Sequence, residues 1–245
     1  MIPVLEVLLA VIAWGVSFVA TKVALGFVSP ATVIWLRFGM GVLILGTATA
    51  VRRQFAIPGG KELAYLALLG FLGITFHQWL QSTGLQTAQA TTTSWIVATT
   101  PIFMALLGWA ALGERLVLRQ AIGILLAALG VLLVVTQGDL RGLAKGRFGT
   151  VGDFLVLISA LNWAVFSTLS RRGLRQFPAT RMMFYVMMFG WLFSSLLFLA
   201  QTGLSEVRAL PGEGWLSVGF LGVFCSGLAY IFWYDALQSL MVNRR

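Results

Sequence analysis

Eight apolar stretches, separated by short polar or glycine-rich connections, dominate the pattern of the 245-residue chain. Each contains about 20 residues, the length that an α-helix needs to cross a bilayer core of roughly 30 Å. None alternates apolar and polar residues with a period of two, as barrel strands do. The pattern therefore predicts an all-α polytopic membrane protein. The eight predicted transmembrane helices are residues 4–24, 30–50, 63–84, 91–112, 117–136, 151–170, 182–202 and 214–237.

The composition excludes the common soluble classes of protein. Hydrophobic residues make up 59% of the chain and charged residues only 10%, whereas soluble domains have about 45–50% and about 25%. Such a chain cannot cover a water-facing surface, which argues against a soluble enzyme, a nucleic-acid-binding protein and a disordered scaffold. With a single cysteine, Cys225, and a single histidine, His77, the sequence predicts no internal disulfide and no metal site. We expect no cofactor.

The net charge of +9 is best explained by membrane orientation. If the N-terminus is cytoplasmic, the connections at 51–62, 113–119 and 171–181, together with the C-terminal tail, hold eleven Lys and Arg residues. The connections on the other side hold four. Because positive charges concentrate in cytoplasmic loops, the sequence predicts a multi-pass protein with a cytoplasmic N-terminus.

An internal repeat relates the two halves of the chain at an offset of 148 or 149 residues. Three short segments recur in the same order, which is unlikely by chance. The matched pairs are Trp14-Gly15-Val16 with Trp163-Ala164-Val165, Pro30-Ala31-Thr32 with Pro178-Ala179-Thr180, and Gly70-Phe71-Leu72-Gly73 with Gly219-Phe220-Leu221-Gly222.

The repeat unit predicts two domains of opposite orientation. The first repeat, residues 1–136, contains five predicted helices, and the second, residues 150–245, contains three. Because five is odd, the second copy must lie inverted in the membrane relative to the first. A complete second copy would need two more helices, so we expect eight transmembrane helices of a ten-helix plan.

Several segments resemble the EamA type of the drug/metabolite transporter superfamily. They are Thr99-Thr100-Pro101-Ile102-Phe103, Leu112-Gly113-Glu114-Arg115-Leu116, and Ala13-Trp14-Gly15 with Lys22. The resemblance covers essentially the whole chain and departs where the ninth and tenth helices of the family would follow Leu240. It implies a carrier of small metabolites or drugs in the bacterial inner (plasma) membrane, often an exporter, without an ATP site.

Polar side chains inside the predicted helices are the candidates for a substrate pathway, because they are costly in hydrocarbon. In the third helix His77 and Gln81 share a face with three glycines, and Ser226, Tyr230 and Trp233 hold related positions in the last. Two such faces would line a central cavity. Alternatively, the glycines permit close helix contact and the polar groups bond across the bundle. His77 would either couple transport to protons or act as a neutral hydrogen-bonding group.

Other helices add aromatic and charged candidates. Arg37 could hold a substrate carboxylate, pair with Asp153 or extend toward the interface; its repeat partner is Tyr185. Pro101 interrupts the fourth helix, which marks either a binding site or a kink whose carbonyls bond to threonines. Aromatic residues of the first and sixth helices could stack on a substrate or simply anchor the helices. The predicted pathway consists of Trp14, Ser17, Thr21, Arg37, His77, Gln81, Trp95, Thr99, Pro101, Asn162, Trp163, Tyr185, Ser226, Tyr230 and Trp233.

The sequence favours a secondary transporter that works by alternating access between two inverted repeats and moves a small-molecule substrate across the lipid bilayer, without contact to nucleic acid. The first alternative is a truncated, non-transporting remnant or a partner-binding membrane protein that needs a second subunit. A remote alternative is an intramembrane enzyme with a Ser226–His77 dyad, although no motif around Ser226 supports it. We therefore expect a protein that is not an enzyme.

Overall fold

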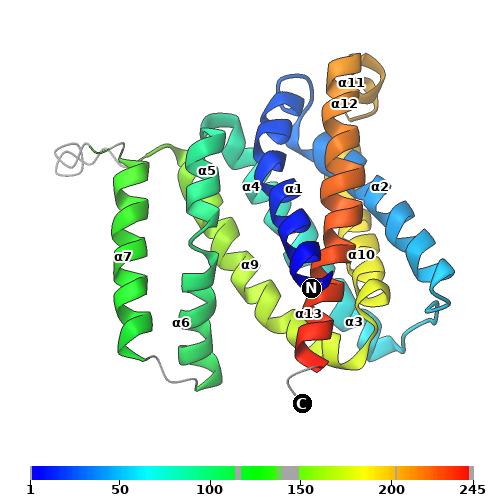
Figure 1. The fold of residues 1–245 in the computed structure, drawn as a ribbon. Coiled ribbons are helices and arrows are strands. Elements are labelled where there is room, and N and C mark those ends of the chain that lie inside the picture. Colours follow the sequence, from blue (N-terminus) through cyan, green and yellow to red (C-terminus); the bar gives the residue numbers. More distant parts are fainter. Residues whose placement is uncertain (1, 114–116, 137, 139–148, 202, 243–245) are drawn as a thin grey trace.

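The computed structural model describes residues 2–113, 117–136, 138, 149–201 and 203–242, and within these ranges every regular element is a helix (Figure 1). In the first half of the chain the elements are α1 (Ile2–Ala24), α2 (Pro30–Val51), α3 (Gly60–Gly70), η1 (Phe71–Phe76), α4 (His77–Thr87), α5 (Ala90–Val97), α6 (Thr100–Leu112) and α7 (Leu118–Val135). In the second half they are α9 (Val151–Gln176), α10 (Ala179–Ala200), α11 (Gly203–Ala209), α12 (Gly212–Phe220), η2 (Leu221–Leu228) and α13 (Ala229–Val242). Glu114 and Arg115, which belong to one of the segments singled out in the sequence, lie outside the described residues.

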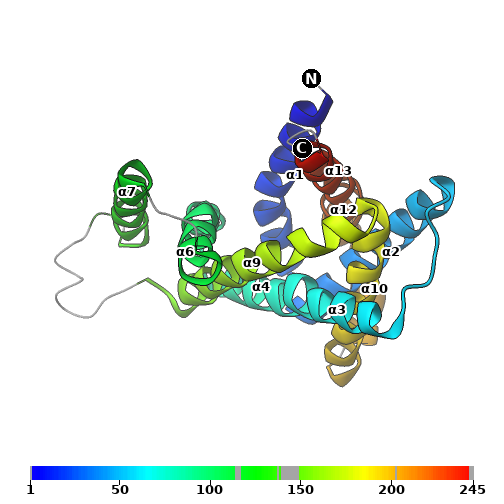
Figure 2. The ribbon, with the colours of Figure 1, turned by 90° about the horizontal axis from the view of Figure 1, so that it is seen from below.

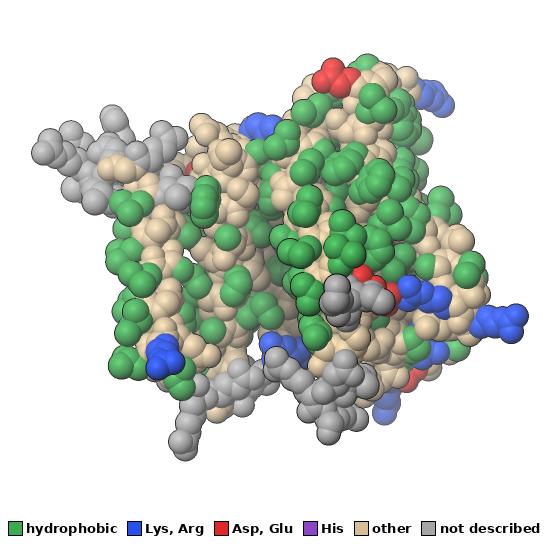
Figure 3. Space-filling view, in the orientation of Figure 1, with side chains coloured by type: hydrophobic (Ala, Val, Ile, Leu, Met, Phe, Trp, Pro, Cys, Tyr) green, Lys and Arg blue, Asp and Glu red, His purple; other side chains and the backbone are tan. Residues whose placement is uncertain are grey.

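Seven helical stretches are long and apolar enough to cross a membrane, which confirms the prediction of an all-α polytopic membrane protein. They are Val4–Ala24, Pro30–Val51, Gly60–Thr87, Ala90–Ala110, Val151–Gln176, Ala179–Ala200 and Gly212–Leu240. The remaining predicted helix, 117–136, forms α7, whose described apolar part, Leu118–Leu133, is shorter. Hydrophobic side chains cover the middle of the visible face, and most Lys and Arg side chains lie toward its lower end (Figure 3).

Three helix pairs, each joining the two halves of the chain, form the body of the molecule. α2 packs along α10, α4 packs along α9, and α1 packs along α13. The main core lies where these pairs meet and includes Phe38, Leu45, Met183, Met187 and Tyr234, all buried. Viewed from below, α7 stands at the edge of the molecule, away from this core (Figure 2). The core therefore depends on both halves.

Local sequence signals explain where several helices begin. The hydroxyl of Ser29 accepts a hydrogen bond from the backbone N–H of Thr32, and Pro30 occupies the first turn of α2. At the start of α9, Thr150 and Asp153 form a reciprocal capping box, in which Asp153 Oδ2 lies 2.7 Å from the backbone nitrogen of Thr150. Asp153 therefore caps α9, and the predicted alternative in which it pairs with Arg37 is wrong.

Glycines set the close approach of helices from the two halves. A Cβ added to Gly70 would lie 2.5 Å from the carbonyl oxygen of Val186 and 2.8 Å from the nitrogen of Gly190, both on α10. A Cβ on Gly73 would lie 2.5 Å from the ring of Phe166. These glycines line a helix contact, which is the role that the packing alternative predicts for them.

We expect the substitution Gly70→Ala to lower the free energy of unfolding by about 1–3 kcal/mol, because the added methyl group forces α3 away from the backbone of α10. Gly219, its partner in the predicted repeat, is the matched control, since no atom lies within 4 Å of its added Cβ. Gly219→Ala should be neutral or slightly stabilising, as alanine favours helix. Thermal unfolding of both variants in detergent checks this; equal losses would contradict the close approach at Gly70.

Two π-helical segments interrupt long membrane helices at corresponding places. η1 connects α3 to α4, and η2 connects α12 to α13. In a π-helix the N–H groups bond to carbonyls five residues back, so the side chains that follow are turned relative to an uninterrupted α-helix. π-Helical turns are frequent at functional sites. η1 lies directly before His77 and Gln81, and η2 contains Ser226 and lies directly before Tyr230.

Candidate functional site

Arg37 lies at the centre of the candidate site. It is on α2, about 10 Å along the helix from Pro30, and only 3% of its surface is exposed. Its Nε donates a hydrogen bond to the hydroxyl of Ser226 at 3.0 Å, and its Nη1 donates to Oε1 of Gln78 at 3.2 Å. The guanidinium also lies 4.9 Å from the ring centre of Phe38. Neutral groups from both halves of the chain thus hold a buried positive charge.

A cavity of about 90 Å³ opens beside this guanidinium. It is bounded by helices of both halves, namely α1, α2, α4, α5, α9 and α13. The lining residues are Trp14, Ser17, Phe18, Arg37, His77, Gln78, Gln81, Val97, Trp163 and Tyr230. Its lining, mostly apolar with a few converging polar groups, is typical of small-molecule sites, while its volume is below the roughly 300–1,000 Å³ of open sites.

Aromatic rings make up much of the cavity wall. The ring of Trp14 lies 5.5 Å from that of Tyr230 and 6.3 Å from that of Trp163, in both cases edge to face. Trp163 and Tyr230 lie 6.4 Å apart, again edge to face. These contacts connect α1, α9 and α13 around the cavity, so the wall offers ring faces and edges to an apolar group.

Backbone carbonyls of the two π-helical segments fix two of the candidate side chains. The indole Nε1 of Trp14 donates to the carbonyl of Cys225 in η2 at 2.9 Å. Asn162 Nδ2 donates to the carbonyl of Leu72 in η1 at 2.7 Å. The first helix of each half therefore binds the π-helical segment of the other half. Asn162 is thereby a bridge between helices and does not line the cavity.

His77 takes part in the wall through its ring. Its Nδ1 lies 3.0 Å from the carbonyl oxygen of Ser159, and its ring centre lies 4.8 Å from that of Trp163. Because a carbonyl oxygen only accepts, Nδ1 must carry the proton. Ser226 instead binds Arg37, so the hydrogen bond between Ser226 and His77 that an intramembrane hydrolase would need is not formed.

The break in the fourth predicted helix is a satisfied kink. α5 ends at Val97 and α6 begins at Thr100, with Pro101 in its first turn. The hydroxyl of Thr100 donates to the carbonyl of Val97 at 2.7 Å, and that of Thr99 donates to the carbonyl of Ile96 at 2.6 Å. This matches the alternative in which threonines satisfy the carbonyls. The kink nevertheless places Val97 in the cavity wall.

The structure brings seven of the predicted pathway residues to the cavity: Trp14, Ser17, Arg37, His77, Gln81, Trp163 and Tyr230. Ser226 lies behind Arg37 as its hydrogen-bond partner. Seven others lie away from the cavity wall: Thr21, Trp95, Thr99, Pro101, Asn162, Tyr185 and Trp233.

Several of these outlying residues have structural partners. Trp233 packs on Trp14 with ring centres 5.3 Å apart, and the hydroxyl of Tyr185 donates to the carbonyl of Ala56. Trp95 is 60% exposed on the outer surface, as expected for a side chain facing lipid. Lys22 donates to the carbonyls of Leu85 and Ala88 and so caps the end of α4; it does not join Arg37.

Sequence reasoning missed three lining residues, Phe18, Gln78 and Val97. The clearest signal for Gln78 is that it follows His77 within an apolar helix, where a second polar side chain needs a partner. Gln78 lies three positions before Gln81 on α4, so an ordinary α-helix already places it beside the face of His77 and Gln81. Its Oε1 accepts from Arg37 at the cavity.

Polar clusters join helices at two ends of the molecule. Toward one end, Glu206 Oε2 of α11 accepts hydrogen bonds from the backbone nitrogen and the hydroxyl of Ser29, at 3.0 and 2.8 Å. Toward the other, Arg52 forms a salt bridge of 2.7 Å with Asp235 of α13, and Thr180 donates to the same carboxylate. Arg37 lies between Ser29 and Arg52 along α2, so the two clusters flank the cavity.

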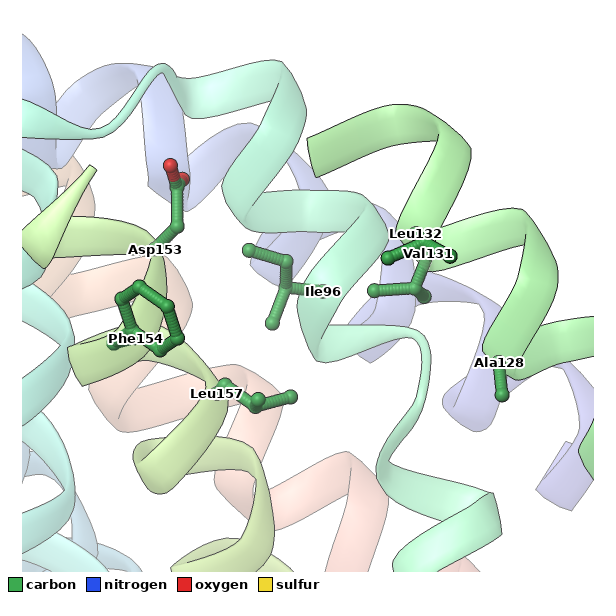
Figure 4. A pocket seen from close by; sticks show the side chains of 7 residues that line it. All are labelled: Ile96, Ala128, Val131, Leu132, Asp153, Phe154 and Leu157. Atoms are coloured by element: carbon green, nitrogen blue, oxygen red, sulfur yellow. The ribbon is translucent and has the colours of Figure 1, made fainter. Parts of the chain in front are cut away.

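A second hollow, of about 250 Å³, lies between α5, α7 and α9 (Figure 4). Its lining residues are Ile96, Ala128, Val131, Leu132, Asp153, Phe154 and Leu157. Apolar side chains face one another across it, and Asp153, the one charged lining residue, already caps α9. It lacks the converging polar groups that fix the orientation of a bound molecule. The cavity at Arg37 is therefore the better candidate.

Comparison with known proteins identifies the family. The sequence profile of the EamA-like transporter family matches residues 1–136 and 150–244. The chain belongs to the EamA-like transporter family. It is thus a multi-pass membrane protein of a transporter family, and the resemblance noted in the sequence is confirmed.

Curated relatives of this EamA-like chain carry transporter names. An uncharacterized transporter of Archaeoglobus fulgidus is 27% identical over 94% of the chain and 78% of the relative. A probable terminal-alkyne amino-acid exporter of Streptantibioticus cattleyicolor is 27% identical over 96% of the chain and 76% of the relative. A solved crystal structure, 23% identical, matches with a TM-score of 0.67 over 96% of the chain and 80% of that protein, which supports the fold.

Proposed function

We propose that the chain is a secondary transporter that carries small organic molecules through the cavity at Arg37 by alternating access. The observation that carries this proposal is the cavity itself, which is mostly apolar, holds a buried charge and is built by helices of both halves. Such a position allows movement of one half against the other to expose the site to either side. The probable terminal-alkyne amino-acid exporter among the relatives favours outward transport of a small metabolite.

The proposed moving parts are two inverted repeats, residues 1–136 and 150–245. Their support is the sequence repeat, together with the paired π-helical segments η1 and η2. α10 packs on η1 and α2 packs on η2, so the second helix of each repeat contacts the third helix of the other repeat. A relative rotation of the repeats would therefore change the contacts on both sides of the cavity together.

The two polar clusters are the proposed gates. The Glu206–Ser29 cluster would close the outer side, and the Arg52–Asp235 cluster would close the cytoplasmic side. This assignment follows from the predicted cytoplasmic N-terminus in the inner membrane, which puts Arg52 and its neighbouring basic residues inside. In the structure both clusters are formed, and the cavity between them is small.

Cross-linking of each gate tests the proposed mechanism. The pairs Ser29→Cys with Glu206→Cys and Arg52→Cys with Asp235→Cys are each placed in a Cys225→Ala background and bridged by a short thiol-specific reagent. In proteoliposomes loaded with a panel of labelled amino acids, organic acids and organic amines, the uncross-linked protein should move at least one compound. Each bridge alone should stop that flux, because both gates must open in turn.

The single-cysteine variants treated with the same reagent are the controls, since they carry the modification without the bridge. Where the bridging reagent is attached through disulfide bonds, reduction of those bonds should restore flux. Flux that continues with either gate bridged, or no flux of any compound above protein-free liposomes, would overturn the proposal.

A further inference from the structure

Among the described residues, no carboxylate provides a counter-charge for Arg37. No carboxylate of the described residues lies within ion-pair distance of its guanidinium, whose partners are the neutral groups of Ser226 and Gln78. Elsewhere the chain does pair an arginine, as Arg52 with Asp235 shows. An unpaired charge inside a membrane is expensive and is kept where it serves a substrate or ion. The missing negative charge is therefore expected to come from a bound molecule.

Three of the five N–H groups of Arg37 have no hydrogen-bond partner among the described residues. Ser226 uses the N–H of Nε, and Gln78 uses one N–H of Nη1. Within the described part of the chain, Nη2 has no hydrogen-bond acceptor, and Arg37 lines the cavity. One N–H group of Nη1 and both N–H groups of Nη2 are left, and neighbouring N–H groups of a planar guanidinium match the two oxygens of a carboxylate.

The rest of the cavity wall limits the kind of molecule that fits. Trp14, Trp163 and Tyr230 offer aromatic surface to an apolar group. None of the lining residues is Asp or Glu, so a cationic substrate would meet the charge of Arg37 without compensation. Ser17 and Gln81 have oxygen atoms that can accept hydrogen bonds from a substrate ammonium group.

From this arrangement we propose that Arg37 binds the carboxylate of the substrate, and that the substrate class is small carboxylates with an apolar or aromatic side, either simple organic acids or amino acids. The inference rests on the proposed transport function and names the chemistry of the same site. The fork of Arg37 fixes the carboxylate, the aromatic wall contacts the apolar part, and Gln78 and Ser226 hold the guanidinium in place.

Binding of four related probes to the purified protein tests the substrate class. The probes are 3-phenylpropionate, its neutral amide, the cation phenethylamine and the zwitterion L-phenylalanine, each measured by thermal shift and titration calorimetry. We expect at least one of the two carboxylates to bind at least about tenfold more tightly than the amide and the amine. Binding of 3-phenylpropionate alone indicates simple acids, whereas preference for L-phenylalanine indicates amino acids.

Variants locate the carboxylate. Arg37→Gln should weaken binding of the preferred carboxylate at least about tenfold, and Arg37→Lys should weaken it less, because the charge remains but the fork is lost. Arg53→Gln, at an exposed arginine outside the membrane helices, is the matched control and should change nothing. The substrate class is decided by comparing the probes on the unmodified protein, so a folding defect in Arg37→Gln would not affect that result.

Failure of this inference differs from failure of the transport proposal. Preference for the amide or the amine, carboxylate binding that survives Arg37→Gln, or no carboxylate binding at all would overturn the substrate class. Nitrate, measured as an added probe, would also overturn it if it bound as tightly as the preferred carboxylate, since the aromatic wall would then contribute nothing to binding. If the protein carried an amine or a neutral compound in the proteoliposome assay, and a bridge at either gate stopped that flux, the transport proposal would still hold.

Discussion

The variant Arg37→Gln is expected to transport carboxylates at least about 100-fold more slowly than the unmodified protein while losing no thermal stability. Removing one partner of a buried charged hydrogen bond costs about 3 kcal/mol, which corresponds to roughly 100-fold. The fold itself should gain, because the buried charge of Arg37 has no protein counter-charge among the described residues. The amide of glutamine reaches as far as the Nε of arginine, so it can still hydrogen-bond to Ser226.

Initial rates in proteoliposomes and unfolding midpoints in detergent, measured on the same preparation, check both parts. Arg53→Gln serves again as the matched loss of one arginine. A variant that lost both transport and stability would show that Arg37 mainly holds the helices together, and one that kept transport would remove Arg37 from the site.

The second large effect is expected for Trp14→Ala, which should lower the free energy of unfolding by about 3–5 kcal/mol. The indole contacts Trp163, Tyr230 and Trp233, and its Nε1 satisfies the carbonyl of Cys225. Its removal leaves a void at the junction of α1, α9 and α13. Thermal or denaturant unfolding in detergent measures the loss.

Two further variants separate packing from the hydrogen bond. Trp14→Phe keeps most of the ring contacts but loses the donor to Cys225, so about 1–3 kcal/mol of the loss should remain. Trp109→Ala is the surface control, because Trp109 is 55% exposed on α6. If Trp109→Ala costs as much as Trp14→Ala, the junction described for Trp14 is not a stabilising element.

The helices and their order could be predicted because each membrane crossing requires a long apolar segment in the sequence. A bilayer needs about 20 apolar residues in each crossing, and the predicted helix at 30–50 agrees closely with α2, Pro30–Val51. The break at Pro101 was also predictable, since proline removes a backbone donor. The π-helical segments were not predictable, because a shift of hydrogen-bond register changes neither composition nor hydrophobic pattern.

The site was predictable only where a residue type is unusual for its surroundings. Arg37 and His77 stand out because charged and titratable groups are rare within apolar helices, and the structure brings both to the cavity. Tyr185 was a candidate only as the repeat partner of Arg37, and its hydroxyl binds the carbonyl of Ala56. The bond between Arg37 and Ser226 joins residues 189 positions apart, a separation that no local pattern reveals.

That separation has a consequence for biosynthesis. At roughly 5–20 residues per second, the ribosome needs about 10–40 seconds after making Arg37 before it reaches Ser226. Gln78, only 41 positions later, is available much sooner. During this interval α2 carries an incompletely solvated cation, so its release into lipid before α12, η2 and α13 emerge would be unfavourable. We therefore expect α2 to stay at the insertion machinery until the last helices arrive.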